Sequence, residues 1–147
     1  MKGASATVEP IVVVGTGKAR LGDVEAWRDL PEFRKASVPM MLAAKALEHS
    51  LASLTPSALR NKADLGLVVG VDHGELEVTK DFLVTLAQKG IARPFLFQSA
   101  LHNATLGFLS MRHGLTGPGL TTSTHEFAGE DALELAADLV RGGDAPA

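Results

Sequence analysis

Three candidate strands, each next to a glycine, are the feature that most constrains the fold. Ile11–Gly15 reads IVVVG and Leu65–Gly70 reads LGLVVG, and both are short apolar runs; residues 117–124 (GPGLTTST) are a turn that leads into the third strand. Short continuous apolar runs bounded by glycine or turn residues are typical of buried strands. Helical patterns lie between and after these runs. Strands that alternate with helices favour an α/β layer structure with a mainly parallel sheet.

Four amphipathic helices are predicted from the spacing of apolar residues. Pro39 suits the first turn of the first helix, and His113–Gly114 and Gly142–Gly143 are predicted helix ends. Thr16–Ser37 is predicted to be a loop, and residues 93–99 (RPFLFQS) to be extended or irregular. The apolar positions of the four helices are Met40, Ala44, Leu47 and Leu51; Phe82, Leu83, Leu86 and Ala87, in a helix over about 75–88; Leu101, Ala104, Phe108 and Met111; and Leu133, Ala136, Ala137 and Val140.

The composition is that of a single globular domain. The chain has 147 residues, 46% hydrophobic and 21% charged, and we expect residues 1–147 to form one domain. The net charge of −3 and the scattered basic residues give no reason to expect a nucleic-acid partner. The start does not resemble a secretory signal and no run is long enough to span a membrane, so we expect a cytoplasmic protein. The absence of cysteine excludes disulfides, thiolate zinc sites and cysteine nucleophiles from this sequence.

Several chemical motifs are approached but not completed. GTGKARLG departs from the dinucleotide pattern at Arg20 and from the Walker pattern at Ala19, which favours a turn after a strand over a nucleotide site. HEFAG would need a second histidine at Gly129 to resemble a zinc protease. VDHGE around His73 favours a strand-to-helix connection with Asp72 near the cap. The histidines at positions 49, 73, 102, 113 and 125 lack metal-ligand spacing. We expect no metal and no cofactor.

The final third of the chain carries the most specific motif. GLTGPGLTTSTHEFAGEDALELAADLVRGGDA resembles the segment around the active-site cysteine of β-ketoacyl synthases of the thiolase fold. The family pattern there is approximately G-x-x-G-P-x-x-x-x-S-T-A-C-S-S-G-x-x-A-L. Upstream, PIVVVGTG resembles the family's first strand, LGLVVGVDHGELEVTKDFL its second strand and following helix, and ARPFLFQSALHNATLGFLSMRHGL its acyl-pocket loop and next helix. The residues that match the pattern in register are Gly114, Gly117, Pro118, Ser123, Thr124, Gly129, Ala132 and Leu133.

The resemblance implies a truncated N-terminal half of a three-layer, thiolase-like α/β fold, with a mostly parallel sheet flanked by helices. Glu126 then occupies the position of the family's nucleophilic cysteine, and His125 and Phe127 flank it. The family's cysteine is activated at a helix N-terminus and carries the acyl group, whereas Glu126 cannot form that thioester. The family's second half, which supplies two histidines (or histidine and asparagine) and a lysine, has no counterpart in the sequence. Carbon–carbon condensation by this chain alone is therefore not expected.

Three roles for Glu126 remain open. Ser123–Glu126 fits a capping box, in which Glu126 only starts the last helix. Some ketosynthase-like partners carry glutamine in place of the cysteine and shape the chain-length pocket of an active partner. Loading domains with the same replacement decarboxylate malonyl groups, and a Glu126 kept neutral by a raised pKa would be a weak analogue acting on malonyl-carrier protein.

The resemblance also implies association through two segments. In the family, the strand before the nucleophile pairs antiparallel across a two-fold axis, and its counterpart is Leu120, Thr121, Thr122 and Ser123. The loop that contains Phe95, Leu96 and Phe97 reaches toward the neighbour's acyl pocket, unless these side chains fill this chain's own core.

The expected function is therefore a non-catalytic, chain-length-factor-like subunit of bacterial fatty-acid or polyketide biosynthesis, with aryl polyene synthesis as one setting. Its expected partner is an active ketosynthase, in a heterodimer, or a second copy, with acyl carrier protein as a further candidate. The alternative is an independent homodimeric binding protein on the same scaffold.

Overall fold

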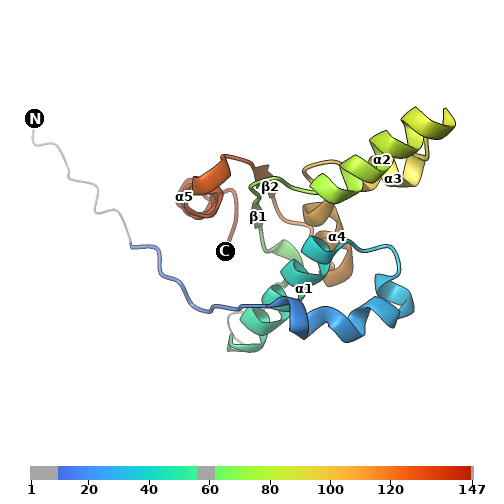
Figure 1. Cartoon of the computed structure of the whole chain (residues 1–147). Coiled ribbons are helices and arrows are strands. Elements are labelled where there is room, and N and C mark those ends of the chain that lie inside the picture. Colours follow the sequence, from blue (N-terminus) through green and yellow to red (C-terminus); the bar gives the residue numbers. More distant parts are fainter. Residues whose placement is uncertain (1–9, 56–61, 147) are drawn as a thin grey trace, which may run out of the picture.

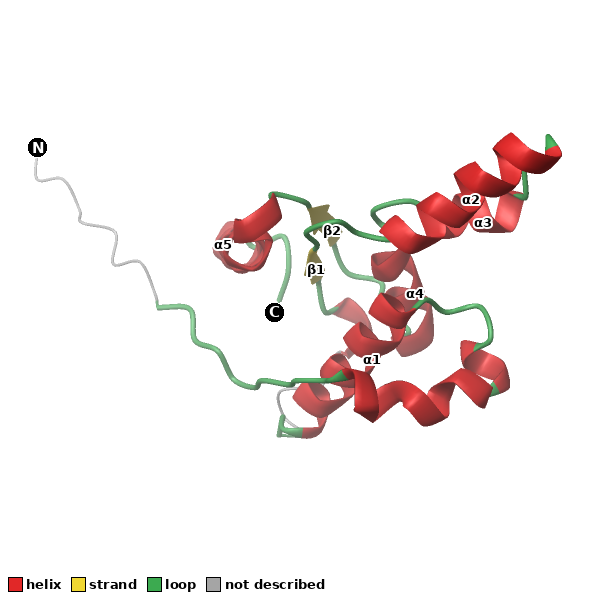
Figure 2. Cartoon of the chain, viewed as in Figure 1, coloured by secondary structure: helices red, strands yellow, loops and turns green. Residues whose placement is uncertain are grey.

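The computed structural model describes residues 10–55 and 62–146. Two short strands lie near the middle of the molecule, with helices on either side of them (Figures 1 and 2). In chain order the elements are 3-10 helices at Leu21–Asp29 and Pro31–Phe33, α1 (Val38–Ala52), a 3-10 turn at Lys62–Asp64, β1 (Leu67–Gly70), α2 (Leu76–Lys89), α3 (Pro94–Ser99), α4 (Ala104–His113), β2 (Gly119–Thr122), a 3-10 turn at His125–Phe127 and α5 (Ala128–Gly142).

The strands β1 and β2 form a parallel pair with Leu67 opposite Gly119 and Gly70 opposite Thr122. Residues on one strand alternate between the two faces of a sheet, so the two glycines belong to opposite faces. A Cβ at Gly119 would point at the Leu106 side chain of α4, whereas a Cβ at Gly70 would point at the Ala128 carbonyl of α5. Helices α4 and α5 therefore cover opposite faces. The prediction of an α/β structure with a parallel sheet is confirmed.

The buried cluster lies away from the sheet, where the two N-terminal 3-10 helices meet α1. Val24, Phe33 and Met41 form its centre. The Trp27 ring stacks on Phe33 with ring centroids 4.3 Å apart, and the guanidinium of Arg112, on α4, lies 4.3 Å from the centroid of the Phe33 ring. The prediction of a loop over Thr16–Ser37 is therefore wrong over much of its length. These residues form short helical turns because Val24 and Phe33 bury their side chains against α1.

Local capping signals set the helix boundaries. Ser37 is the N-cap of α1, and its hydroxyl oxygen accepts a hydrogen bond from the Met40 amide at 3.2 Å. Pro39 lies in the first turn, where a missing amide costs no helical hydrogen bond. Gly114 and Gly143 end α4 and α5 in the left-handed conformation. The predicted positions of these ends are confirmed.

The predicted strand at Ile11–Gly15 does not form. Residues 10–20 have no regular secondary structure, and the side chains of residues 11–14 are exposed. Gly17 lies so close to α1 that a Cβ there would collide with the Ala46 and Ser50 backbone, whereas a Cβ at Gly15 would meet the Ser53 and Leu54 side chains just after the helix. The Lys18 carbonyl accepts from His49 Nδ1 at 2.7 Å. The glycines therefore hold the chain against α1, and no described strand pairs with the apolar run that precedes them.

Residues 94–99 form helix α3 rather than an extended segment. Pro94 begins the helix, which packs on α2 with the rings of Phe82 and Phe97 5.7 Å apart. Helix α2 itself was predicted, but Leu83 and Leu86 on its predicted apolar side are exposed. Within the described ranges, no helix combines the length and the apolar character needed to cross a bilayer.

Two glycine substitutions test the packing of the sheet. Gly70→Ala should lower the free energy of unfolding by about 1–3 kcal/mol, because its Cβ would overlap the Ala128 backbone. Gly119→Ala is the matched control, since its Cβ would meet Leu106 at an ordinary 3.4 Å. That variant should be neutral or up to about 1 kcal/mol more stable, as a glycine in a strand loses more entropy on folding. Urea unfolding followed by circular dichroism measures both, and equal effects would contradict the packing described.

Candidate functional site

Polar side chains gather where β1 and β2 end. Asp72 and His73 follow β1, and Ser123–Phe127 follows β2. The strands are parallel, so these two loops lie at the same edge of the sheet. The carboxyl ends of parallel strands are where α/β proteins commonly bind ligands. We call Asp72, His73, His125 and Glu126 the strand-end cluster.

One carboxylate lies between two imidazoles in this cluster. Asp72 Oδ2 lies 2.8 Å from His73 Nδ1, and Asp72 Oδ1 lies 3.4 Å from His125 Nδ1. The two rings meet edge to face, with centroids 6.1 Å apart. All three side chains are more than half exposed. Such an arrangement orients each imidazole through Nδ1 and leaves Nε2 available to accept or donate a proton. In the described part of the chain, no group of three or more potential ligands is placed to hold a metal ion.

The predicted capping box at Ser123–Glu126 is wrong. The Ser123 hydroxyl donates to the backbone carbonyl of Asp72 at 3.1 Å, and so ties the two loops together. A 3-10 turn at His125–Phe127 follows, and α5 begins only at Ala128 without a side-chain cap. The capping role is lost because the serine hydroxyl bonds to the neighbouring loop instead of to its own helix.

His125 has an unusual backbone conformation. Its φ is +55°, and among the described residues it is the one non-glycine residue with a positive φ. A side chain with a Cβ pays about 1–2 kcal/mol for the left-handed region, and such strain is concentrated at functional sites. The turn carries His125 to the Asp72 carboxylate while its side chain stays 81% exposed.

Glu126 and Phe127 both point into solvent. Phe127 is an exposed large hydrophobic residue, and Glu126 is exposed within the 3-10 turn. Among the described residues none forms a hydrogen bond or an ion pair with the Glu126 side chain. Glu126 still lies in the turn before α5, where a negative charge is favoured by the helix dipole.

Glu75, close in sequence to the cluster, has a buried carboxyl group that the sequence pattern does not indicate. The sequence pattern instead predicts Asp72 near the start of α2. The N-cap is Glu75, whose side chain is buried and accepts from the Thr105 hydroxyl at 2.7 Å. Its second oxygen, Oε2, has no partner among the described residues. Gly74, with φ +55°, lies against the His102 ring. A glutamate directly after a glycine at a strand-to-helix turn is the signal that could have identified this residue.

The predicted interface residues lie on two separate elements. Leu120, Thr121 and Thr122 belong to β2, and Ser123 follows it. Phe95, Leu96 and Phe97 belong to α3, where Phe95 and Phe97 are exposed and Leu96 is half-buried. The alternative that these three side chains fill the core is therefore wrong for the two phenylalanines.

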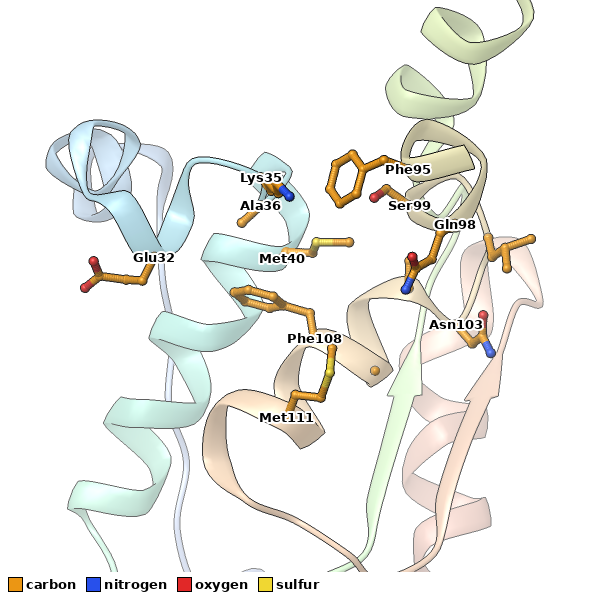
Figure 3. Close-up of a pocket in the computed structure, with 13 residues that line it drawn as sticks. Glu32, Lys35, Ala36, Met40, Phe95, Gln98, Ser99, Asn103, Phe108 and Met111 are labelled. Carbon is orange, nitrogen blue, oxygen red and sulfur yellow. The ribbon is translucent and has the colours of Figure 1, made fainter. Parts of the chain in front are cut away.

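A cavity of about 490 Å³ lies between α1, α3 and α4 (Figure 3). Met40, Phe95, Phe108 and Met111 line it, and Lys35 Nζ lies 4.7 Å from the centroid of the Phe95 ring. None of the strand-end cluster lines this cavity. The structure therefore brings Phe95 to a pocket that is distinct from the loops around Glu126.

The remaining histidines have structural surroundings. His49 bonds to the Lys18 carbonyl, and His102 lies against Gly74. Burial lowers the pKa of His113, and the nearby charges of Lys62 and Arg112 lower it further, against an opposing effect of Glu48.

A family model described as the N-terminal domain of β-ketoacyl synthases matches residues 35–147. The chain belongs to the β-ketoacyl synthase family. The match includes both strands and the loops of the strand-end cluster, so the family resemblance drawn from the sequence is confirmed. Residues 1–34 of the sequence lie outside the matched region.

Individual relatives agree with this assignment. A 3-oxoacyl-[acyl-carrier-protein] synthase 2 from Rhizobium meliloti is 30% identical over 135 residues, which is 89% of this chain and 32% of that protein. A protein of the same name from Vibrio cholerae is 34% identical over 89 residues, 59% of this chain and 22% of that protein. The chain therefore spans about a third or less of these curated relatives.

A solved structure is also similar. One chain of a ketosynthase–chain length factor complex from Xenorhabdus doucetiae matches with a TM-score of 0.62 and 26% sequence identity, over 78% of this chain and 46% of that chain. Together with the family model, it confirms a thiolase-like α/β fold that corresponds to part of a β-ketoacyl synthase.

Two substitutions at one position test the strain at His125. His125→Gly removes the left-handed penalty and should leave stability unchanged or raise it by about 1 kcal/mol. His125→Val should be about 1–2 kcal/mol less stable than His125→Gly, because a branched side chain fits a positive φ poorly. Both variants lose the contact with Asp72, so the difference between their unfolding free energies reports the backbone alone. Equal stabilities would show that the turn relaxes without cost.

Proposed function

We propose that the chain is a non-condensing, ketosynthase-like subunit of bacterial fatty-acid or polyketide biosynthesis. It pairs with a cysteine-bearing ketosynthase and contributes to the surroundings of that partner's acyl group, as a chain length factor does. Aryl polyene synthesis is one setting for such a pair. Membership of the β-ketoacyl synthase family and similarity to a chain of a ketosynthase–chain length factor complex support the proposal.

The observation that carries the proposal is the residue at the nucleophile position. Glu126 stands where the family motif has cysteine, in an exposed turn before α5. A carboxylate there cannot hold an acyl group as a thioester. It also does not serve as the helix cap that would make it purely structural. The chain thus retains the scaffold around the position but not its chemistry.

The outer edge of β2 supports the pairing. The carbonyls of Pro118 and Thr122 accept hydrogen bonds from the Leu67 and Val71 amides, and so face β1. Backbone groups alternate in direction along a strand, so those of Gly119 and Thr121 point to the opposite edge. An open edge is a template for a strand from another chain. Leu120 is exposed on this same strand.

The exposed aromatic side chains of α3 supply a second contact. Phe95 borders the cavity between α1, α3 and α4, and Phe97 is exposed beside it on the same helix. Exposed aromatic residues of this kind are enriched at the centres of protein interfaces. We assign Phe95 and Phe97 to the part of the interface nearest the partner's acyl group.

Capture from an extract of the source organism tests the proposed partner. The tagged chain should recover a cysteine-bearing ketosynthase at near-equal stoichiometry, as measured by quantitative mass spectrometry. The isolated chain should not condense acyl and malonyl groups. Recovery of the chain without any ketosynthase would overturn the proposal in favour of an independent homodimeric binding protein. Release of carbon dioxide from malonyl-carrier protein that is lost in Glu126→Ala would overturn the non-catalytic role.

A matched pair of leucine variants tests the interface. Leu120→Arg places a charge on the open strand and should reduce recovery of the ketosynthase by roughly tenfold or more. Leu133→Arg makes the same change at a leucine that is also exposed, at 64% against 38% for Leu120, but on α5. It should leave recovery unchanged. Equal recovery with both variants would place the interface elsewhere.

A further inference from the structure

An exposed apolar segment precedes the first helical turn. Ile11, Val12, Val13 and Val14 are 39%, 68%, 70% and 66% exposed, and none of them lies in a helix or strand. Four consecutive β-branched residues without a charge have high strand propensity. Such a segment in water is a strand without a partner. Sequence reasoning predicted it to be buried in the sheet, and the structure leaves it outside.

Residues 15–18 are anchored on α1. Gly15 and Gly17 lie against the C-terminal half of α1, and the Lys18 carbonyl is bonded to His49. From this anchor the apolar segment runs outward from the body of the molecule, shown in blue in Figure 1. A Cβ at Gly17 would collide with the Ala46 carbonyl of α1, so this close contact requires glycine.

The same chain carries an open edge that fits this segment. The Leu67 and Val71 amides donate to β2, so by alternation the backbone groups of Val68 and Gly70 point to the other edge of β1. Among the described residues no strand covers that edge. It has the same four-residue length as the exposed segment. Donor and acceptor are therefore both present in one molecule.

We propose that residues 11–14 of one copy pair as a strand with the outer edge of β1 in a second copy, giving a reciprocal strand-exchanged dimer. A second copy is favoured over the chain's own sheet because the anchor on α1 directs the segment outward. The exchange is self-complementary, so a two-fold pair satisfies both segments and both edges at once. This contact uses the edge of β1 that lies opposite β2, and it does not depend on a ketosynthase partner.

A charge on the segment tests the exchange in the purified full chain. Val13→Lys should raise the dimer dissociation constant by roughly tenfold or more, because a lysine on a strand opposes edge pairing. Ile91→Lys is the matched control: Ile91 is an exposed β-branched residue, at 58% against 70% for Val13, but lies between α2 and α3. Light scattering over a concentration series measures both. Dimers as tight with Val13→Lys as without it would overturn the proposal. A dimer that is lost in Leu120→Arg but kept in Val13→Lys would also overturn it, because Leu120 lies on β2 and the proposed contact uses β1.

The absence of cysteine from the chain allows a direct cross-linking test. Cysteine is placed at each of positions 11–14 in turn, together with Val68→Cys, and the protein is oxidised at low concentration. The expected product is a covalent dimer on a non-reducing gel, formed by at least one of the four pairs. A disulfide within a monomer would show that the segment pairs with its own sheet and would overturn the exchange. The failure of all four pairs to cross-link would also overturn it.

Discussion

The parallel pairing of β1 with β2 is the constraint on which the rest of the structure depends. Each strand has only four residues, and a pair of that size needs helices on its faces to be stable. Helices α4 and α5 supply them, and α5 approaches Gly70 so closely that no side chain fits between. Because the strands run in the same direction, the loops that follow them meet at one edge, and this meeting creates the strand-end cluster.

At the strand-end cluster, a hydrogen bond between two loops takes the place of local helix capping. The sequence around Ser123 and Glu126 fits a capping box, but the Ser123 hydroxyl bonds to the carbonyl of Asp72, 51 residues away in sequence. The turn that results puts His125 at a positive φ and brings it to the Asp72 carboxylate. Tertiary bonding between two loops has thus outweighed local capping, and Glu126 is left exposed in the turn before α5.

Elements governed by local rules could be predicted from the sequence. Helix α1 follows from Ser37, Pro39 and its apolar spacing, and Gly114 and Gly143 end their helices because glycine enters the left-handed region without strain. Elements governed by missing or distant partners could not. Residues 11–14 have the composition of a buried strand, but composition does not supply a neighbouring strand. Helix α3, which begins at Pro94, packs on α2 through the rings of Phe97 and Phe82. Periodicity in so short a segment does not reveal this contact.

The sequence by itself determined the α/β class with a parallel sheet and the β-ketoacyl synthase family. Each of these depends on residue identity and local spacing. Only the tertiary structure decided that Asp72 lies between His73 and His125, that Glu75 is buried, and that no strand in the described part of the chain covers either outer edge of the β1–β2 pair. Those features depend on which loops and strands pack together in the folded chain. The contacts that stabilise them join residues far apart in the sequence, which local sequence patterns do not relate.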